Sequence, residues 1–313
     1  MYKLNRCQSL FLLSWLLLAA VLVISGCERH PPAAQELPGA KAAAATRVQY
    51  LAQRLRDNDL VGYAKAMTTP EQYQRAEQAW REGRSLWPLT EMPLSAELPQ
   101  LLVTLSKPGA AKSLQRSFDS QLAGQQHEIQ QAVQSMGMFG VQYLRNHAEY
   151  TPEQRACYVQ WVQALTQWAG TAPLADRDLA VKALAELTMA ARKTGLDSPE
   201  ALREAGMEES LRRLEPFFAV FKQVLANYNL SLDTTFEQLQ AGQINQQGKI
   251  ARVRFRYPLA AATIDTTASL VKLEGQWYLQ RSQEELQQLL ADPAAPAAAD
   301  SATEQHANPA TGR

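Results

Sequence analysis

Three arginines at alternate positions are the residues of this sequence whose type and spacing most readily suggest chemistry. Arg252, Arg254 and Arg256 fall in a segment with the two-residue period of a β-strand. On one strand face their guanidinium groups would lie about 6.8 Å apart, close enough to meet a phosphate-bearing or carboxylate-rich surface. The alternative, which the sequence favours, is a solvated face on which Arg254 pairs with Asp265 across the strands.

The four histidines are spaced too widely for a metal site. His127 and His147 fall at opposite ends of one predicted helix, and His30 and His306 fall near the two ends of the chain. At 1.5 Å per residue about 30 Å separates the two central histidines, so they cannot share an ion within that helix. We find no Gly-x-Ser-x-Gly elbow, no Ser-x-x-Lys with Lys-Thr-Gly and no phosphate-binding loop. The sequence therefore predicts a non-enzymatic protein without a metal.

The beginning of the chain combines basic residues, an apolar run and a cysteine. Lys3 and Arg6 precede the almost wholly apolar stretch from Leu10 to Val23, and Ile24-Ser25-Gly26-Cys27 follows directly. The apolar run is short for a permanent membrane span and ends in small residues rather than in a charged flank. These features predict a signal peptide that is removed.

This segment resembles the signal peptide and lipobox of bacterial lipoproteins. The resemblance implies a diacylglyceryl thioether on Cys27, cleavage between Gly26 and Cys27, and acylation of the new amine. Three acyl chains on Cys27 imply lasting membrane attachment, because each methylene buried in the bilayer contributes about 0.8 kcal/mol. Glu28, where an aspartate would favour inner-membrane retention, implies the outer membrane rather than the inner one. The alternative is an uncleaved signal anchor in which Cys27 is an ordinary thiol; the small residues at the cleavage point favour removal.

Charge and cysteine usage fit such an exported protein. Lysine plus arginine equals aspartate plus glutamate at 31 each, so the chain lacks the basic excess that nucleic-acid binding requires. With Cys7 removed and Cys27 acylated, Cys157 is the one remaining thiol, and no internal disulfide can form. Cys157 shares a predicted helix face with Trp161, which predicts a buried structural thiol rather than a nucleophile.

The order of the predicted elements defines the fold class, which is α+β. We expect a mostly α-helical body followed by a small C-terminal antiparallel β-meander packed on helices. In chain order, the sequence predicts a lipoprotein signal peptide (1–26), the lipidated cysteine with a flexible tether (27–45), an α-helical domain (46–228), a β-meander with a closing helix (229–291) and a disordered Ala/Pro-rich tail (292–313). Extended at about 3.3 Å per residue, the tether would hold the body up to roughly 60 Å from the bilayer.

Helix starts are the clearest local signals in the body. Thr69-Pro70-Glu71-Gln72 and Thr151-Pro152-Glu153-Gln154 predict capping boxes, and Ser198-Pro199-Glu200 predicts a similar start. The prolines from Trp87-Pro88 to Pro99 predict an irregular connection. Besides two short helices on either side of residues 57–59, helices are predicted for Leu114–Leu122, Glu128–Asn146, Thr151–Trp168, Asp176–Lys193 and Glu208–Asn227.

Two packing predictions follow from residue spacing in these helices. In the Glu128 helix a core-facing stripe is predicted, formed by Ile129, Val133, Met136, Phe139 or Gly140, and Tyr143. Gly137 and Gly140 predict either close helix contact or a kink. The indole rings of Trp80, Trp87 and Trp161 are expected to pack in the interior.

The meander follows from a change of period near residue 230. Strands are predicted for Ile250–Tyr257, Thr263–Leu273 and Trp277–Leu279, with a weaker strand for Gln240–Asn245 and a turn at Glu274-Gly275. Side-chain faces favour a register that leaves residues 258–261 as the loop. This register places Phe255 opposite Ile264, Ala251 opposite Ala268 and Arg254 opposite Asp265.

A closing helix over Ser282–Leu290 is expected to cover the sheet face that carries Val253, Ile264, Leu270, Trp277 and Leu279. The meander with its Gly275–Leu279 hairpin weakly resembles the closing half of cystatin-like and nuclear-transport-factor-like cones. That resemblance implies a small hydrophobic cleft between sheet and helix, and no particular function.

These observations lead to one functional hypothesis and two alternatives. We expect a lipoprotein of the bacterial cell envelope that faces the periplasm and acts as a non-enzymatic accessory or scaffolding subunit for another envelope component. The first alternative is a carrier that holds a small hydrophobic ligand or lipid in the cleft beneath the meander, and the second is an enzyme with an unrecognised site. No cofactor is expected besides the lipid on Cys27. Lipid headgroups, lipopolysaccharide, peptidoglycan or an acidic protein would suit the three arginines.

Overall fold

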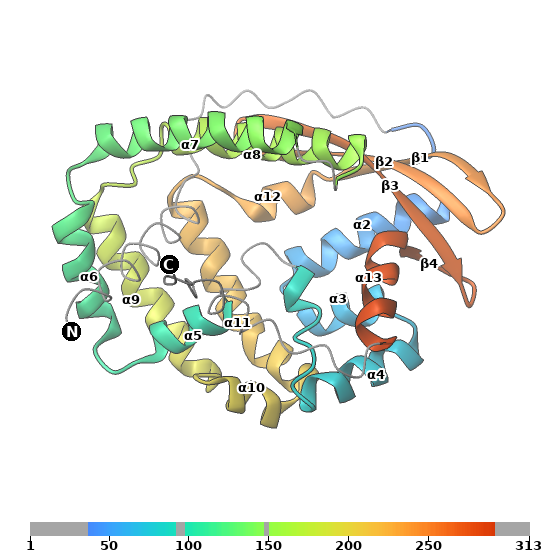
Figure 1. The fold of residues 1–313 in the computed structure, drawn as a ribbon, viewed down its shortest axis with the longest axis horizontal. Helices are drawn as coiled ribbons and strands as arrows, with labels where there is room; N and C mark the ends of the chain where they lie inside the picture. Colours follow the sequence, from blue (N-terminus) through green and yellow to red (C-terminus); the bar gives the residue numbers. More distant parts are fainter. Residues whose placement is uncertain (1–36, 92–97, 147–149, 292–313) are drawn as a thin grey trace, which may run out of the picture.

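The computed structural model describes residues 37–91, 98–146 and 150–291 (Figure 1). The predicted signal peptide, Gly26 and Cys27, His30, His147 and His306, and the predicted tail lie outside the described residues. Within them the predicted fold class is confirmed: a mostly helical body precedes a four-stranded antiparallel sheet that contacts helices.

The helices of the body differ in length and are joined by short connections. In chain order they are α2 (Ala43–Arg56), α3 (Leu60–Met67), α4 (Pro70–Arg81), η1 (Leu89–Glu91), α5 (Leu98–Ser106), α6 (Ala110–Gln121), α7 (Gln126–Asn146), α8 (Pro152–Ala169), α9 (Arg177–Thr194), α10 (Pro199–Ala205), α11 (Met207–Asn227) and α12 (Leu232–Glu237). The sheet contains β1 (Gln240–Gln247), β2 (Ile250–Leu259), β3 (Ala262–Leu273) and β4 (Gln276–Leu279), and α13 (Gln280–Ala291) follows it.

Both predicted capping boxes form. At the start of α4 the Gln72 amide N–H donates to Thr69 Oγ1 at 3.3 Å, and the Thr69 N–H donates to the Gln72 side chain at 2.9 Å. Thr151 and Gln154 make the same pair of bonds at α8, and Ser198 caps α10 by accepting from the Ala201 N–H. Each cap satisfies backbone donors that the first helical turn leaves free, which explains why these starts could be predicted.

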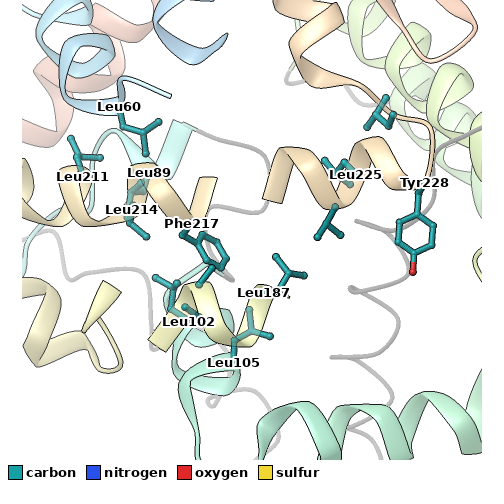
Figure 2. Close-up of a cluster of buried hydrophobic side chains, with 14 of the residues drawn as sticks. Leu60, Leu89, Leu102, Leu105, Leu187, Leu211, Leu214, Phe217, Leu225 and Tyr228 are labelled. Carbon is teal, nitrogen blue, oxygen red and sulfur yellow. The ribbon is translucent and has the colours of Figure 1, made fainter. Parts of the chain in front are cut away.

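Helix α11 forms the centre of the body. Its buried side chains contact α3 and η1 on one side and α5 and α9 on the other, in one hydrophobic cluster (Figure 2). Figure 2 shows Leu211, Leu214 and Phe217 of α11 between Leu60 of α3 and Leu102 of α5. Trp80 and Trp87 are fully buried in the same cluster, and Trp161 packs against it in part, as predicted.

A buried lysine joins α11 to α2 and α12. The Lys222 side chain is 3% exposed, and its ammonium donates to the carbonyl oxygens of Leu55 (3.3 Å) and Arg56 (2.6 Å) and to the Asp233 carboxylate. Leu55 and Arg56 end α2, where carbonyl groups lack intrahelical donors and the helix dipole is negative. The Lys222 ammonium therefore adds a charged donor at the end of α2, where the Leu55 carbonyl also accepts from the Asn58 backbone N–H at 3.2 Å.

The predicted strands form, but the predicted register is wrong by two residues. The structure pairs Tyr257 with Ile264, Phe255 with Thr266, Ala251 with Leu270, Arg254 with Thr267 and Arg256 with Asp265. A slip of two keeps every side chain on its predicted face, so face polarity alone could not exclude it. The turn decides the register: β2 and β3 are joined by two residues, and Ala260 adopts a positive φ of 53°. Alanine rarely adopts this conformation, so no residue type at this position indicates so tight a turn.

Helix α2, more than the closing helix, covers the inner face of the sheet. Ala44, Ala45 and Val48 of α2 form a buried cluster with residues of all four strands, among them Val253 and Leu270. Helix α13, predicted as the cover, contributes the fully buried Leu286, which packs with Ile264 in the main core. The alanine-rich stretch before residue 46, predicted as tether, thus begins α2. Leu37, the first described residue, is already buried, at 8% exposed.

Other parts of the chain bond both edges of the sheet. Strand β4 pairs only with residues 270–273 of β3, and the Gln160 side chain of α8 bonds the remaining edge of β3 at Asp265. The Gln160 Oε1 accepts from the Asp265 N–H at 2.9 Å, and the Gln160 side-chain amide donates to the Asp265 carbonyl at 3.1 Å. At the other edge the Gln243 N–H of β1 donates to the Gly39 carbonyl at 3.2 Å. These contacts seat α8 and residues 37–42 on the sheet.

Two helices form where the sequence predicted none. Helix α5 begins at Leu98, and Pro99 occupies its first turn, where proline is tolerated because the missing N–H has no partner there. Helix α12 is short and is capped by Ser231, whose hydroxyl accepts from the Thr234 N–H at 3.1 Å. Pro99 had instead been interpreted as part of an irregular connection.

Replacing Lys222 by methionine should destabilise the fold by about 2–4 kcal/mol, because the Leu55 and Arg56 carbonyl groups and the Asp233 carboxylate lose a charged donor held by a buried side chain. Denaturation by urea, followed by far-ultraviolet circular dichroism, measures the change. Lys182→Met is the matched control, because the Lys182 side chain is 61% exposed and its ammonium lies 4.0 Å from the Glu186 carboxylate. This substitution should change the free energy of unfolding by less than about 0.5 kcal/mol. Equal effects of the two substitutions would contradict the capping role of Lys222.

Candidate functional site

The three arginines singled out by their spacing lie on the outer face of β2, each with a carboxylate partner. Arg254 donates to both Asp265 oxygens, at 2.7 and 2.5 Å, and Arg256 Nε donates to Asp265 Oδ2 at 3.0 Å. Arg252 lies 3.3 Å from the Glu153 carboxylate of α8. The predicted Arg254–Asp265 ion pair is therefore confirmed, although Asp265 lies directly opposite Arg256.

The electrostatics of this face match a solvated network in which two carboxylates compensate most of the guanidinium charge. Hydrogen bonding from Arg254, and then from Arg256, lowers the pKa of Asp265 below its ordinary value of 3.8, although partial burial acts in the opposite direction. Asp265 and Glu153 offset two of the three guanidinium charges. An anionic ligand would have to displace these carboxylates, so the geometry favours the structural interpretation of this face.

Cys157 is half-buried where α8 meets the sheet, which agrees with the structural role predicted for it. Desolvation raises the pKa of its thiol, although a hydrogen bond with Thr266 opposes this effect. A raised pKa keeps the thiol protonated at neutral pH, whereas a nucleophilic cysteine needs the thiolate. Beside it, Trp161 Nε1 donates to the Tyr257 hydroxyl at 2.7 Å, which ties α8 to β2.

A further polar cluster lies where α3, α4 and α11 meet. Glu208 accepts from the Tyr73 hydroxyl at 2.9 Å and pairs with Lys65 at 3.0 Å and Arg212 at 2.9 Å. Hydrogen bonding from Lys65 lowers the pKa of Glu208, and burial raises that of Tyr73. These shifts hold the carboxylate ionised and the phenol protonated, so the cluster ties helices together and has no group poised to exchange a proton near neutral pH.

Among the described residues, no group of three or more histidine, cysteine, aspartate or glutamate side chains could hold a metal ion. In the same part of the chain, no helix has the length and apolar character needed to cross a membrane.

The most distinctive surface lies on α7. Met136, Phe139 and Tyr143 are 51%, 76% and 54% exposed, and Ala132 on the same side is exposed too. We call these four residues the α7 seam. The prediction that Met136, Phe139 and Tyr143 face the core is wrong. At about 100° per residue, the inward face passes through Ile129, Val133 and Gly137, and the seam lies roughly a quarter turn away.

The seam is exposed because α7 packs extensively against α8 alone among the described elements (Figure 1). The two helices approach closely at Gly137, where an added Cβ would overlap the Thr166 side chain. At Gly140 an added Cβ would lie 3.5 Å from Val162, an ordinary contact. Gly137 therefore marks the close helix contact that the sequence left open, and α8 is the main neighbour of α7 among the described elements.

The chemistry around the seam is apolar and uncharged. From Ile129 to Leu144 the chain has no charged residue, so no lysine or arginine stem shields the exposed side chains. Ser135, Met136, Phe139, Gly140 and Tyr143 line a shallow, mostly apolar depression. Another such depression lies between α6 and α9, with Met189 (53% exposed) beside Arg192 and Lys193. The α7 seam is thus a continuous apolar stripe, whereas the α9 depression has a basic border.

Comparison with known proteins gives no match: no family model, no curated protein and no solved structure is significantly similar to the chain. The weak resemblance of the meander to cystatin-like cones therefore contributes nothing to the functional argument. The site rests on the geometry of the described residues and on the sequence around Cys27.

Gly137→Ala should destabilise the protein by about 1–3 kcal/mol, because the new methyl group must displace Thr166 or separate α7 from α8. Gly140→Ala is the matched control in the same helix. Its methyl group has room, so the higher helix propensity of alanine should leave stability unchanged or increase it by about 0.5–1 kcal/mol. Thermal unfolding measures both; a stabilising Gly137→Ala would show that α7 is not seated through this contact.

Asp265→Asn tests the balance of the arginine face through pH. Because the folded-state pKa of Asp265 lies below its ordinary 3.8, the ion pairs stabilise the fold fully above about pH 4 and lose this effect as pH falls through the folded pKa. At pH 7 we expect the free energy of unfolding of the wild type to exceed that of Asp265→Asn by about 1 kcal/mol. The difference is no larger because the network is partly exposed. This difference should shrink below pH 4 in denaturation experiments; a difference that persists to pH 2 would contradict the ion-pair account.

Proposed function

We propose that this protein is a lipid-anchored lipoprotein of the bacterial cell envelope that acts as a non-enzymatic accessory or scaffolding subunit. Its body faces the periplasm and is attached to a membrane through the acylated Cys27. Glu28 favours the outer membrane over the inner one. It binds another envelope component through the α7 seam. The observation that carries the proposal is this exposed, charge-free apolar stripe on a helix with one main neighbour.

The burial of Leu37, the first described residue, supports a short connection between Cys27 and the folded body. Because Leu37 is already buried against β1, the chain available between Cys27 and the body reaches at most about 35 Å at 3.3 Å per residue. That is a little over half of the roughly 60 Å expected for a tether that ends at residue 45. Surface residues of the body are therefore confined to the region near the membrane, where partners that are attached to the same membrane meet them often.

Apolar exposure of this kind distinguishes a binding surface from ordinary surface residues. Isolated apolar side chains are common on proteins, whereas a contiguous stripe without charged residues is typical of a contact surface. The proposed ligand-carrier alternative receives no such support, because Ala44, Ala45 and Val48 of α2 pack directly on the inner face of the sheet. The two depressions described above, on α7 and between α6 and α9, contain neither a carboxylate nor a thiol, so they give no support to the enzyme alternative.

Cys27→Ser tests the anchor. The variant should retain its signal peptide, carry no lipid and leave the fraction that is extracted only by detergent, because the serine hydroxyl cannot form the thioether. Mass spectrometry and membrane fractionation of the full-length protein measure these outcomes. Cys157→Ser is the control and should leave acylation and fractionation unchanged. Acylated, membrane-bound Cys27→Ser protein would overturn the lipoprotein proposal.

Met136→Gln tests the docking role of the seam. After cross-linking in living cells, the amount of partner recovered with Met136→Gln should be about tenfold lower than with the wild type. The reason is that the glutamine amide would be buried unpaired at the contact. Met189→Gln is the matched control, since Met189 on α9 has almost the same exposure, 53% against 51%. If both variants recover the same cross-linked products as wild type, the seam is not the docking surface.

A further inference from the structure

A basic surface with an apolar centre lies where α6 and α9 run side by side. The Arg177 guanidinium at the start of α9 lies 2.8 Å from the Asp119 carboxylate near the end of α6, so the two helices are antiparallel. Ala111 of α6 therefore lies beside α9, where it lines a shallow depression with Ala185 and Met189. We call these three residues, together with the six exposed basic residues of the same two segments, the α6–α9 face. The six are Lys107, Lys112, Arg116, Lys182, Arg192 and Lys193.

The spacing of residues along α9 places its basic and apolar side chains on one side of the helix. At about 100° per residue, Lys182, Met189 and Lys193 lie within about 40° of one another around the helix axis. Ala185 and Arg192 lie next to them, and the opposite side of α9 is buried in the core. The exposed side of α9 thus combines apolar residues with basic residues on both flanks.

The charge of the α6–α9 face differs from that of the whole chain, in which basic and acidic residues are equal at 31 each. Residues 107–116 and 182–193 contain six basic residues and one acidic residue, Glu186. Within the described residues, Glu186 is the one carboxylate that pairs with any of the six, at 4.0 Å from Lys182. The arginines of β2, by contrast, each have a carboxylate partner. An anion can therefore approach the α6–α9 face without displacing a carboxylate from the other five basic side chains.

We infer that the α6–α9 face binds the anionic headgroups of a phospholipid bilayer. Proteins that lie on anionic bilayers combine basic residues, which attract the headgroups, with apolar side chains that enter the boundary between headgroups and acyl chains. Met189 is 53% exposed among the basic residues and matches this second requirement. Four of the six basic residues are lysines, whose compact ammonium groups suit a diffuse anionic surface. Recognition of individual carboxylates on an acidic protein favours arginine instead.

The contact would orient the body on the membrane. Because the inference rests on the proposed function, the acylated Cys27 already holds the protein there, and the α6–α9 face adds a second point of contact. Figure 1 shows α6 and α9 at the end of the body opposite β1, and Leu37 packs against β1 at Gly242. A body that is attached near one end and binds headgroups at the other lies along the bilayer and does not swing freely about its attachment.

Quenching from within the bilayer tests this contact. Full-length protein with Met189→Cys and Cys157→Ser carries a fluorophore at residue 189 and is anchored in vesicles whose acyl chains are brominated, so that lipid quenches a fluorophore that touches the bilayer. The label should be quenched in vesicles that contain phosphatidylglycerol and not in vesicles of phosphatidylcholine alone. At about 1 M salt, where the Debye length is about 3 Å, the quenching should be lost. Met138→Cys is the matched control for the label, because Met138 on α7 is 71% exposed, and its signal should not depend on lipid charge.

Removal of two positive charges tests the electrostatic part of the contact. Each basic residue near an anionic bilayer strengthens binding roughly fivefold, so Arg192→Gln with Lys193→Gln should lower the ratio of bound to unbound orientations about 25-fold. The quenched fraction of the label at residue 189 measures this ratio. Lys249→Gln with Lys272→Gln is the matched control, since it removes the same charge from exposed positions on the sheet and should leave quenching unchanged.

Each outcome decides the inference. Quenching that requires anionic lipid, is lost with Arg192→Gln and Lys193→Gln and persists in the sheet control supports it. No quenching in anionic vesicles, or equal quenching in neutral ones, overturns it. If the label is not quenched while the same double substitution removes a cross-linked acidic protein in living cells, the face binds that protein and the inference is likewise overturned. Mass spectrometry of the same samples reports the acylation of Cys27, so failure of the proposed anchor is seen separately from failure of the headgroup contact.

Discussion

The burial of α11 is the constraint on which the helical body depends. Its apolar side chains Leu211, Leu214 and Phe217 lie between α3 and η1 on one side and α5 and α9 on the other. They join these elements in one hydrophobic cluster (Figure 2). The same helix positions Lys222, whose ammonium caps the end of α2, and α2 in turn covers the inner face of the sheet. Through Lys222 and α2, helix α11 is thus connected to the C-terminal sheet, which α8 and α12 also contact. The main hydrophobic cluster includes Ile264 as well as Leu211.

Helix α7 is the exception to this arrangement. It reaches the core only through residues such as Ile129 and Val133 near its start, and its second half rests on α8 through the close approach at Gly137. Helix α8 is itself fixed to the free edge of β3 by Gln160 and to β2 by Trp161. A rigid support therefore presents a helix whose apolar seam faces outward, which is the form that a stable contact surface takes. If the chain is anchored through Cys27, as we propose, such a surface would be held near the membrane and would meet its partner repeatedly.

Local chemistry determined how much of this could be predicted from the sequence. Thr69 and Thr151 each placed a helix start correctly, because a capping box depends on residues four positions apart at most. Structural features that depend on contacts between distant parts of the chain could not be predicted. The alanines before residue 46 have no apolar period, yet they form α2 because alanine favours helices and fits beneath the sheet. Likewise, spacing predicted a core-facing Met136, because periodicity shows that a face is apolar and does not show which element covers it.

Amide hydrogen exchange of the full-length, membrane-bound protein, compared with the same protein diluted in detergent, tests the docking role of α7 most directly. A helix supported on one side opens locally at low cost, so the amides of residues 136–146 should exchange quickly in dilute detergent. Our account predicts that they become protected in the membrane, whereas those of α11 exchange alike in both conditions. Equal exchange of residues 136–146 in the two conditions would contradict the claim that the α7 seam is a docking surface.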